Sequence, residues 1–353
     1  MERRKSKTIK IRNIEIGGNN KIAVQSMTNT PSSDKNITLN QIRELEAAGC
    51  DILRFAVNNM EAVRNIAYYL ENSSIPLVAD IHFDYKLAIE AANAGISKIR
   101  INPGNIGGDD RIKKVVDVCA EKCIPIRIGI NSGSLESDIL KKFGSPTPEA
   151  LCESAIKSAN KLEKFDFDNI ILSVKSSDVV SMIQANRLLS KSCDYPLHLG
   201  VTETGTSKFG IIKSAVGIGS LLADGIGDTI RVSLTDDPVE EVKAANNILR
   251  SLKIKSGINL ISCPTCGRTE IKLIEIADHL QAEIDKIKCD KPIDVALMGC
   301  IVNGPGEARE ADIGVAGGKG EAVLFKKGKI IRKIKEDEII DTLLEEIKRL
   351  VTA

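Results

Sequence analysis

The sequence contains no tryptophan, and aromatic residues make up only 3% of its 353 positions. Its charges nearly cancel as well, leaving a net charge of +1. A nucleic-acid-binding protein needs a basic field to attract phosphates and aromatic rings on which bases can stack, and this sequence offers neither. The composition therefore argues against a nucleic-acid partner.

Long apolar runs are also absent. No segment approaches the roughly 20 apolar residues that a helix needs to span a bilayer. Residues 1–7 are basic, but an alternating polar stretch follows them in place of the apolar core of a signal peptide. We expect a soluble, cytoplasmic protein without a membrane partner, whose nine cysteines are reduced thiols or metal ligands rather than a disulfide framework.

Eight short apolar segments alternate with helical patterns over the first 250 residues. Thr147, Pro148 and Glu149, for example, supply a helix cap, a proline for the first helical position and an acid for the first turn. Eight such units predict a (β/α)8 TIM barrel with its catalytic face at the C-terminal ends of the strands. Residues 8–22, with a turn at 17–20, predict a hairpin that closes the bottom of this barrel. The predicted strands are residues 23–27, 52–57, 77–80, 98–101, 126–130, 170–175, 197–202 and 229–234.

Strand parity divides the side chains of the predicted barrel into two sets. Alternate residues point in opposite directions, and the apolar set, such as Ile126, Ile128 and Ile130, must face the helices. The other set points into the barrel. It contains Arg54, Asp80, His82, Arg100, Asn102, Arg127, Asn131, Ser173, Lys175, His198, Arg231 and Ser233.

Four arginines and a lysine on five strands share this inward parity. Unpaired cations inside a barrel are costly to desolvate, and a multiply charged anion at the mouth would offset that cost. The alternative for any one arginine is a structural ion pair with Asp80 or with an acid on a loop. For the whole set we favour an anion site, with a phosphate or diphosphate as the ligand.

The pattern changes after Leu252. We predict a barrel domain at residues 1–252 and a small α+β domain at residues 253–353. The predicted strands of the second domain are residues 260–264, 293–299, 313–316, 322–325 and 329–334, and its predicted helices are residues 268–288 and 336–350. This domain carries the clustered cysteines.

Cys263 and Cys266 form a Cys-x2-Cys turn, and Cys300 ends an apolar strand as Cys263 does. This spacing indicates a metal site but leaves the metal open. A closed site needs a fourth ligand, and no further cysteine or histidine follows Cys300. His279 lies on the predicted helix away from its apolar face, which favours a surface residue, and Cys289 lies in a charged connector and is a poorer candidate.

Glu307 follows Cys300 after a Gly-Pro-Gly turn. Spacing alone favours an acid on a loop that faces water. The other possibility is a [4Fe–4S] cluster held by three thiolates and this carboxylate, which would leave one weakly held corner open to substrate.

Eight stretches, in order along the whole chain, resemble the 4-hydroxy-3-methylbut-2-en-1-yl diphosphate synthase family in its bacterial two-domain form. No single stretch carries the resemblance. The stretches are VQSMTNT (24–30), ADIHF (79–83), KIRINPGN (98–105), RIGINSGSL (127–135), GVTETG (200–205), IRVSLT (230–235), CPTCGR (263–268) and MGCIVNGPGEA (298–308).

The resemblance implies an iron–sulfur oxidoreductase of the non-mevalonate (MEP) pathway of isoprene biosynthesis. Its reaction would be the reductive ring opening and dehydration of 2-C-methyl-D-erythritol 2,4-cyclodiphosphate to 4-hydroxy-3-methylbut-2-enyl diphosphate. Electrons would arrive one at a time through a [4Fe–4S] cluster, from reduced flavodoxin or ferredoxin. The resemblance also implies a homodimer, in which the cluster domain of one chain caps the barrel of the other.

The same resemblance implies roles for individual residues. The cluster ligands would be Cys263, Cys266, Cys300 and Glu307, which reverses the expectation that spacing alone gives for Glu307. The diphosphate would be held by Arg54, His82, Arg100, Arg127, Asn131, Lys175 and Ser233, which agree with the inward set. Glu203 matches an acid near the substrate that is thought to transfer a proton, so Glu203 and Glu307 are the expected catalytic residues.

Two rival functions belong to other classes of protein. One is a non-catalytic module that binds a phosphorylated metabolite and is stabilised by zinc. The other is a pteridine-binding barrel that transfers a methyl group, which the fold alone equally permits.

Overall fold

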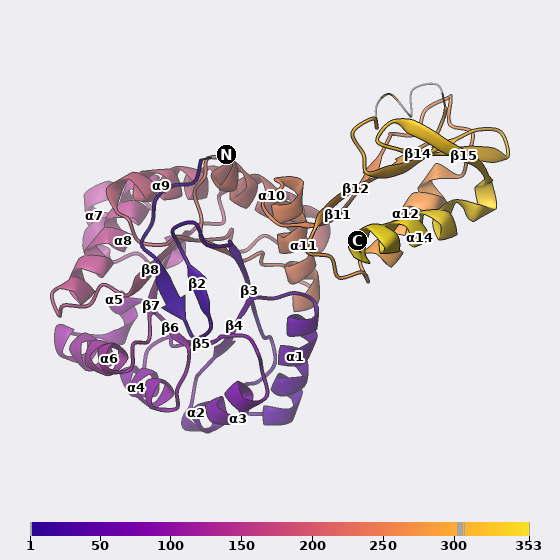
Figure 1. Ribbon diagram of the computed structural model, residues 1–353. Helices are drawn as coiled ribbons and strands as arrows, with labels where there is room; N and C mark the ends of the chain where they lie inside the picture. Colours follow the sequence, from indigo (N-terminus) through magenta and orange to yellow (C-terminus); the bar gives the residue numbers. More distant parts are fainter. Residues whose placement is uncertain (1, 302–305, 307, 353) are drawn as a thin grey trace. The chain divides into compact units, whose positions relative to one another are not determined.

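The computed structural model of the chain describes residues 2–301, 306 and 308–352 (Figure 1). The chain divides into two compact units, Met1–Leu252 and Lys253–Ala353. Glu307, which the resemblance makes both a cluster ligand and a catalytic residue, lies outside the described residues.

Eight parallel strands form the centre of the first unit, in the order β8-β7-β6-β5-β4-β3-β10-β9. A parallel bridge between Leu172 of β8 and Leu197 joins the two ends of this order, so the sheet is a nearly closed barrel. The predicted TIM barrel is therefore confirmed. The strands are β3 (Ala23–Met27), β4 (Ile52–Ala56), β5 (Leu77–Asp80), β6 (Lys98–Ile101), β7 (Ile126–Asn131), β8 (Ile170–Lys175), β9 (His198–Leu199) and β10 (Thr229–Ile230).

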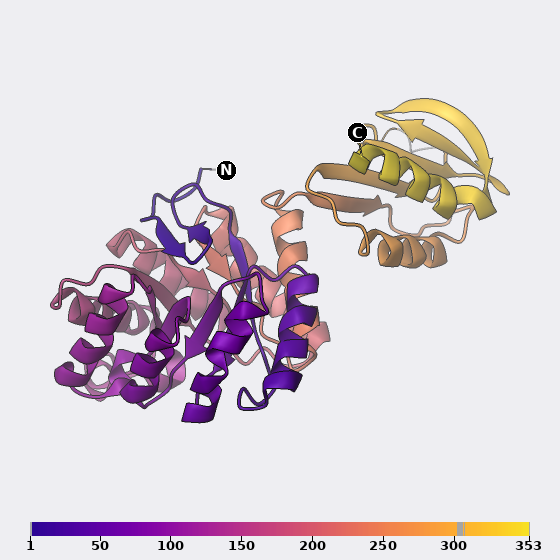
Figure 2. The same cartoon turned by 60° about the horizontal axis from the view of Figure 1, so that its bottom comes forward.

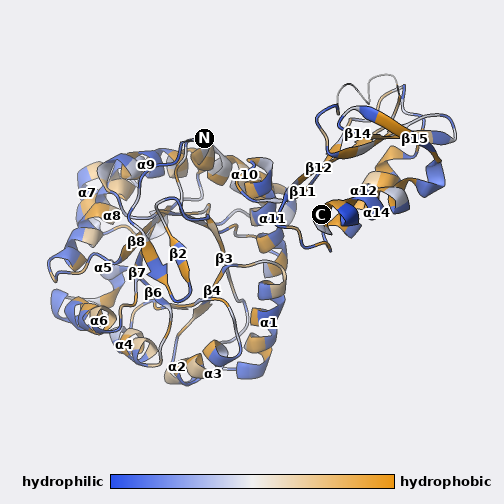
Figure 3. Cartoon of the chain, in the orientation of Figure 1, coloured by the Kyte–Doolittle hydropathy of each residue, from blue (hydrophilic) through white to orange (hydrophobic). Residues whose placement is uncertain are grey.

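Helices surround this barrel, with both apolar and hydrophilic residues along each of them (Figures 1 and 3). The cap predicted at Thr147 is present, because its hydroxyl accepts a hydrogen bond from the amide of Ala150 at 3.2 Å. The helices are α1 (Lys35–Ala47), α2 (Met60–Arg64), α3 (Ile66–Glu71), α4 (Tyr85–Asn93), α5 (Pro103–Ile106), α6 (Asp109–Glu121), α7 (Ser137–Phe143), α8 (Pro148–Glu163), α9 (Val179–Ser192), α10 (Ser207–Ala223) and α11 (Pro238–Ser251).

The last two barrel strands are shorter than the patterns predicted. The predicted strands 197–202 and 229–234 are observed as only His198–Leu199 and Thr229–Ile230. At Gly200 the backbone passes close to neighbouring groups, since an added Cβ would lie 2.7 Å from the carbonyl oxygen of Arg231 and 2.8 Å from Nζ of Lys175. The chain leaves the sheet after Leu199 and after Ile230 and continues as loops at the C-terminal end of the barrel.

The N-terminal hairpin closes the opposite end of the barrel, as predicted. Strands β1 (Ile9–Ile11) and β2 (Ile14–Ile16) are antiparallel, and their isoleucines pack against Ala23 and Ile52 at the N-terminal starts of β3 and β4. The turn is not at residues 17–20 as predicted but at Arg12, whose φ is +53°. The guanidinium of Arg12 donates to the carbonyl oxygens of Leu70 and Ser73, each at 3.2 Å, which holds this left-handed residue in place.

The second unit is a mixed five-stranded sheet with helices on one face (Figure 2). Strands β11 (Gly257–Ser262), β12 (Pro292–Met298) and β13 (Ile313–Gly317) are parallel, and β14 (Glu321–Lys326) and β15 (Lys329–Lys335) follow them antiparallel. Helices α12 (Leu273–Ile284) and α14 (Ile339–Thr352) share one hydrophobic core with this sheet. The predicted α+β class of this unit is confirmed.

The predicted helix 268–288 begins later than expected, at Leu273. The amide of Thr269 bonds to the carbonyl oxygen of Cys266 at 3.0 Å, which makes a turn out of the first predicted residues. None of the helices in the described ranges combines the length and the apolar character that a bilayer span requires.

Candidate functional site

Six cationic side chains lie in the interior of the barrel. Arg127 on β7 is 1% exposed, and the others are buried or nearly so. Five of them were predicted from strand parity, and the structure brings these five together. The six are Arg54, Lys98, Arg100, Arg127, Lys175 and Arg231.

Two buried carboxylates, Asp80 and Glu241, neutralise part of this charge. Asp80 accepts a hydrogen bond from Nη1 of Arg100 at 3.1 Å and lies 3.6 Å from Nε of Arg54. Glu241 lies 3.4 Å from Nη2 of Arg231. The alternative of structural ion pairs is thus correct for these three arginines, but two carboxylates leave the six cations in excess.

Arg127 and Lys175 form no ion pair with a carboxylate within the described part of the chain. Nε and Nη1 of Arg127 are buried without a hydrogen-bond partner there, as is Nε of both Arg100 and Arg231. Buried donors without partners are costly, and an anion at the barrel mouth would supply the missing acceptors. The inward direction of these side chains agrees with the parity argument, and the anion site stays a prediction.

The pKa values of the buried groups reflect the crowding of positive charge. Burial, together with the charge of neighbouring arginines, lowers the pKa of Arg127 and of Lys175 well below their usual values. Burial also lowers the pKa of Arg54 to about 10, although Asp80 opposes this shift. For Asp80, burial alone would raise the pKa, but the charges of Arg54 and Arg100 and the hydrogen bond from His82 lower it.

Sequence reasoning missed two polar members of this cluster. Lys98 donates from Nζ to Oε1 of Gln25 at 3.2 Å, and burial lowers its pKa well below the usual value. Lys98 lies two residues before Arg100 on the same strand, so strand parity could have predicted that it also points into the barrel. Glu241 lies in the first turn of α11, where an acid ordinarily complements the helix dipole, and no sequence signal pointed to the barrel.

His198 lies deeper, at the start of β9. Its Nδ1 is 2.8 Å from the hydroxyl of Thr229, and its Nε2 has no partner within the described residues. Burial, reinforced by the charges of Arg127 and Lys175, lowers the pKa of His198 well below its usual 6.5. His198 is therefore neutral in the folded protein at physiological pH.

This pKa shift predicts a pH dependence of stability. Below about pH 6.5 the unfolded chain binds a proton at His198 while the folded protein does not. The free energy of unfolding should therefore fall by up to about 1.4 kcal/mol for each unit by which the pH is lowered. Urea unfolding of the barrel between pH 7.5 and 5.5 measures this slope. The variant His198→Asn should lose that part of the slope, and His279→Asn, which changes an exposed histidine, should keep it. Equal slopes in the two variants would contradict a buried, neutral His198.

The remaining predicted site residues lie around the mouth of the barrel. The side chain of His82 is 46% exposed, and its Nε2 is 3.5 Å from Oδ2 of Asp80. Asn131, at the end of β7, and Ser233, after β10, are half-buried. All three side chains are more exposed to solvent than that of Arg127.

Glu203 is exposed, in the loop that follows β9. Its φ is +55°, a left-handed conformation that is strained for a residue other than glycine. Hydrogen bonds on both sides hold this loop: the amide of Thr202 donates to the carbonyl oxygen of Ser176 at 3.2 Å, and the hydroxyl of Thr204 donates to that of Ser233. Strain that the surroundings maintain is frequent at functional sites.

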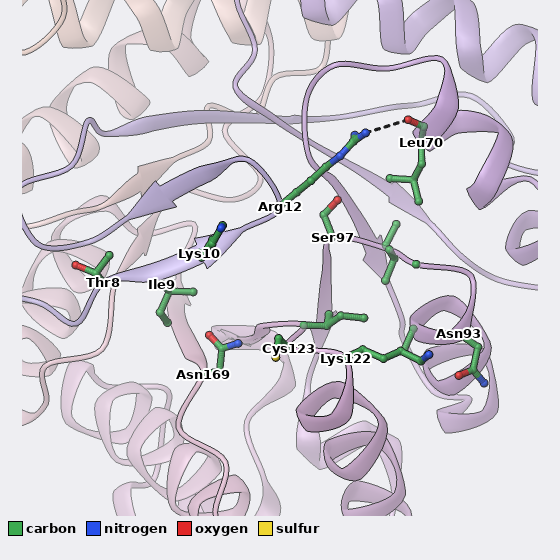
Figure 4. Close-up of a pocket in the computed structure, with 14 residues that line it drawn as sticks. Thr8, Ile9, Lys10, Arg12, Leu70, Asn93, Ser97, Lys122, Cys123 and Asn169 are labelled. Carbon is green, nitrogen blue, oxygen red and sulfur yellow. Dashed lines mark hydrogen bonds between the residues drawn. The ribbon is translucent and has the colours of Figure 1, made fainter.

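A cavity of about 930 Å³ lies at the other end of the barrel, beside the hairpin (Figure 4). Lys10 and Arg12 of the hairpin region line it, together with Lys122 and Cys123 after α6. No predicted site residue in the described part of the chain lines this cavity. The cavity therefore shares no lining residue with the cationic cluster inside the barrel.

In the second unit, Cys263 and Cys300 come to the same edge of the sheet. Ser262 of β11 is in register with Leu297 of β12, so both cysteines follow the C-terminal ends of neighbouring strands. The amide of Gly299 donates to Sγ of Cys263 at 3.2 Å. This hydrogen bond ties Cys263 to the end of β12.

Cys266 is anchored beside this edge. The amide of Glu270 donates to the carbonyl oxygen of Gly299 at 2.9 Å, and the amide of Cys266 donates to the hydroxyl of Thr269 at 3.2 Å. Hydrogen bonds from the backbone and the side chain of Arg268 lower the pKa of the Cys266 thiol. This exposed thiol is thus prepared to ionise, as a metal ligand must.

The three cysteines are not yet arranged as a ligand set. Among the described residues, no group of three or more His, Cys, Asp or Glu side chains is placed so as to hold a metal ion. The donor chemistry nevertheless fits a thiolate-bound centre, because Cys263, Cys266 and Cys300 are free, partly or fully exposed, and gathered at one edge. Cys289, by contrast, donates from Sγ to the carbonyl oxygen of Lys291 at 3.2 Å.

Comparison with known families covers both units. The model of the GcpE TIM-barrel domain matches residues 6–246, and the model of the GcpE protein C-terminal domain matches residues 259–349.

Several curated relatives are similar over their full length and carry the name 4-hydroxy-3-methylbut-2-en-1-yl diphosphate synthase (flavodoxin). The protein of Clostridium perfringens is 54% identical over 351 residues, 99% of this chain and 100% of its own. That of Caldanaerobacter subterraneus is 56% identical over 99% of this chain and 98% of its own. That of Geobacter sulfurreducens is 50% identical over 98% of both chains.

Solved structures share the barrel at low sequence identity. The 3-dehydroquinate dehydratase of Geobacillus kaustophilus has a TM-score of 0.52 and 16% identity, and covers 71% of this chain and 99% of its own. A dihydropteroate synthase of Xanthomonas albilineans has a TM-score of 0.50 and 13% identity, and covers 70% of this chain and 98% of its own. At these identities the similarity concerns the fold alone.

Proposed function

The chain belongs to the GcpE family of enzymes, and from this membership we propose that it converts 2-C-methyl-D-erythritol 2,4-cyclodiphosphate into 4-hydroxy-3-methylbut-2-enyl diphosphate. The reaction would be a reductive ring opening and dehydration, for which a bound [4Fe–4S] cluster would supply the electrons. The relatives' shared name supports this product. The observation that carries the proposal is the excess of buried cations in the barrel, where Arg127, Arg100 and Arg231 each have a donor without a partner among the described residues.

The barrel's part in the reaction is to bind and orient the cyclic diphosphate. Arg127 and Lys175 have no carboxylate partner within the described residues. Hydrogen bonds to phosphate oxygens should therefore stabilise these two buried cations more than the others. The carboxylate of Asp80 forms ion pairs with Arg54 and Arg100 and so fixes the positions of their guanidinium groups. Fixing both phosphate groups would fix the carbon skeleton relative to the reducing centre. We assign diphosphate binding to Arg54, His82, Arg100, Arg127, Asn131, Lys175 and Ser233.

The strained Glu203 is our candidate for proton transfer. It lies exposed at the mouth, held by a loop with fixed hydrogen bonds. The carboxylate would deliver or accept the proton that dehydration requires.

Cys263, Cys266, Cys300 and Glu307 would hold the cluster. When bound, the cluster supplies single electrons and a Lewis-acidic iron corner. We propose reduced flavodoxin or ferredoxin as the electron donor, and the relatives' name includes flavodoxin. We also propose a cytoplasmic homodimer, in which the cluster domain of one chain caps the barrel of another.

Metal analysis after anaerobic purification separates this function from the zinc-stabilised module. We expect a brown protein with about four irons per chain. A colourless protein with stoichiometric zinc would contradict the proposal. Titration with inorganic pyrophosphate and with a pterin separates it from the methyl-transfer barrel, since only pyrophosphate should bind to the cationic site.

Replacing Glu307 tests the fourth ligand. In Glu307→Ala the cluster should assemble poorly or convert to a three-iron form, because the iron at that corner loses its only protein ligand. Iron content and the electron paramagnetic resonance signal measure this. Glu310→Ala, which removes an exposed acid nearby, should leave both unchanged. An intact four-iron cluster in Glu307→Ala would show that Glu307 is a loop acid that faces water.

A further inference from the structure

Glu241 is an acid in the first turn of α11 that is buried although α11 lies on the outside of the barrel (Figure 1). Only 4% of Glu241 is exposed. The neighbouring Glu240 has a side chain that is 43% exposed and pairs with Lys243 at 2.7 Å, as acids in a first helical turn commonly do. A buried carboxylate needs hydrogen bonds that offset its desolvation, so the partners of Glu241 indicate its role.

The two carboxylate oxygens of Glu241 bond to different parts of the barrel. Oε1 accepts a hydrogen bond from the amide of Leu234 at 2.9 Å. Oε2 accepts from the hydroxyl of Ser26 on β3 at 3.3 Å and from Nη2 of Arg231 at 3.4 Å. One oxygen therefore holds the backbone after β10, and the other holds a cation of the buried cluster.

Residues 231–235 need such a contact because β10 before them is short. Strand β10 ends at Ile230, and residues 231–235 belong to none of the strands in the described chain. The amide of Arg231 still donates to the carbonyl oxygen of Leu199 at 2.9 Å. Beyond that bond the backbone depends on other partners, and the bond from Leu234 to Glu241 is one of them.

The same segment is bonded to the loop of Glu203. The hydroxyl of Thr204 donates to the carbonyl oxygen of Ser233. Ser233 and Glu203 are the residues to which diphosphate binding and proton transfer are assigned above. By holding the segment, Glu241 fixes the backbone on which both of these side chains depend.

The contact with Arg231 orients a donor toward the centre of the cationic cluster. Glu241 binds the guanidinium through Nη2, while Nε of Arg231 is buried without a partner among the described residues. The carboxylate also cancels one positive charge of the cluster, which must lower the affinity of the barrel for an anion. Glu241 therefore weakens anion binding and at the same time orders the groups around the anion.

We propose that Glu241 is a positioning residue for the reaction, which acts through Arg231 and through the backbone of residues 231–235. Fixed donors give a bound diphosphate one orientation, and turnover depends on that orientation more than on tight binding. This inference rests on the proposed function, because the substrate roles of Ser233 and Glu203 come from it.

Two substitutions separate the roles of the two oxygens. Glu241→Gln keeps an oxygen that can accept from Leu234 but removes the charge beside Arg231. Pyrophosphate should then bind about tenfold more tightly, whereas the Leu234 amide should exchange its hydrogen as slowly as in the wild type. Glu241→Ala removes both oxygens, so the Leu234 amide should exchange at least about tenfold faster.

Calorimetric titration with pyrophosphate and hydrogen exchange of peptides that contain residue 234 measure these effects on the full-length holoenzyme. Glu240→Gln is the matched control, because it removes the same charge one residue away from a side chain that faces solvent. This control should change neither quantity. A carboxylate that only supported the fold would give weaker pyrophosphate binding when replaced, rather than tighter binding.

Turnover gives a third measurement. In Glu241→Gln, kcat should stay within about threefold of the wild type while KM falls, and in Glu241→Ala kcat should fall at least about tenfold. If the wild type forms no product, the proposed function fails, but the affinity and exchange measurements still decide the role of Glu241.

Unchanged or weakened pyrophosphate binding in Glu241→Gln would overturn the proposal. Wild-type exchange at residue 234 in Glu241→Ala would overturn it as well. If Glu241→Ala does not fold, the affinity of Glu241→Gln decides alone, since glutamine conserves the shape of the side chain.

Discussion

Replacing Cys300 with alanine is expected to abolish turnover, by more than about 1,000-fold, while leaving the barrel able to bind pyrophosphate. Cys300 follows β12 at the edge where Cys263 and Cys266 also lie, and two cysteines cannot retain a four-iron cluster. The substrate cations belong to the other compact unit. The variant Cys300→Ala should therefore lose its electron supply and keep its affinity for pyrophosphate.

Iron content, visible absorbance and pyrophosphate titration of Cys300→Ala measure this separation. The matched control is Cys289→Ala, because Cys289 is a free thiol of the same unit that bonds to a backbone carbonyl. This control should keep both iron and turnover. A Cys300→Ala protein with a full complement of iron and normal turnover would remove Cys300 from the ligand set.

Replacing Arg127 with leucine is expected to have two opposite effects. Affinity for the diphosphate should fall by about 100-fold or more, because a buried, charge-assisted donor to phosphate is lost. The free protein should at the same time become more stable to unfolding, by about 1–4 kcal/mol, since a buried cation without a carboxylate partner within the described residues is replaced by an apolar side chain.

Calorimetric titration with pyrophosphate and urea unfolding without ligand measure the two effects on the same protein. Arg43→Leu, a change to an exposed arginine on α1, should alter neither quantity by more than a small amount. Iron content should remain normal in both variants. Undiminished affinity in Arg127→Leu would refute the parity argument, and a loss of stability would show that Arg127 supports the empty barrel.

The inward direction of the buried cations could be predicted because strand parity is a local rule. Once Ile126, Ile128 and Ile130 are assigned to the outer face, Arg127 must point inward, whatever the rest of the chain does. The same rule gave Arg54, Arg100 and Lys175. It could not give Glu241, which reaches Arg231 from helix α11 and depends on how that helix packs against the barrel.

Features that depend on tertiary contacts were predicted less well. The strands at Leu199 and Ile230 end earlier than their apolar patterns predict. The close approach of the Gly200 backbone to Arg231 and Lys175 is likewise a tertiary contact that no local pattern reveals. The reversal of the hairpin falls at Arg12, where contacts with distant carbonyl groups hold a left-handed residue. The proposal of Glu307 as a fourth cluster ligand rests on family resemblance, since spacing alone favours a loop acid there.

The most direct test of the whole account is turnover of 2-C-methyl-D-erythritol 2,4-cyclodiphosphate by the anaerobically purified protein with reduced flavodoxin. The account predicts formation of 4-hydroxy-3-methylbut-2-enyl diphosphate with two electrons consumed per product. Binding of the cyclodiphosphate without any product, by protein that carries its full iron, would contradict it.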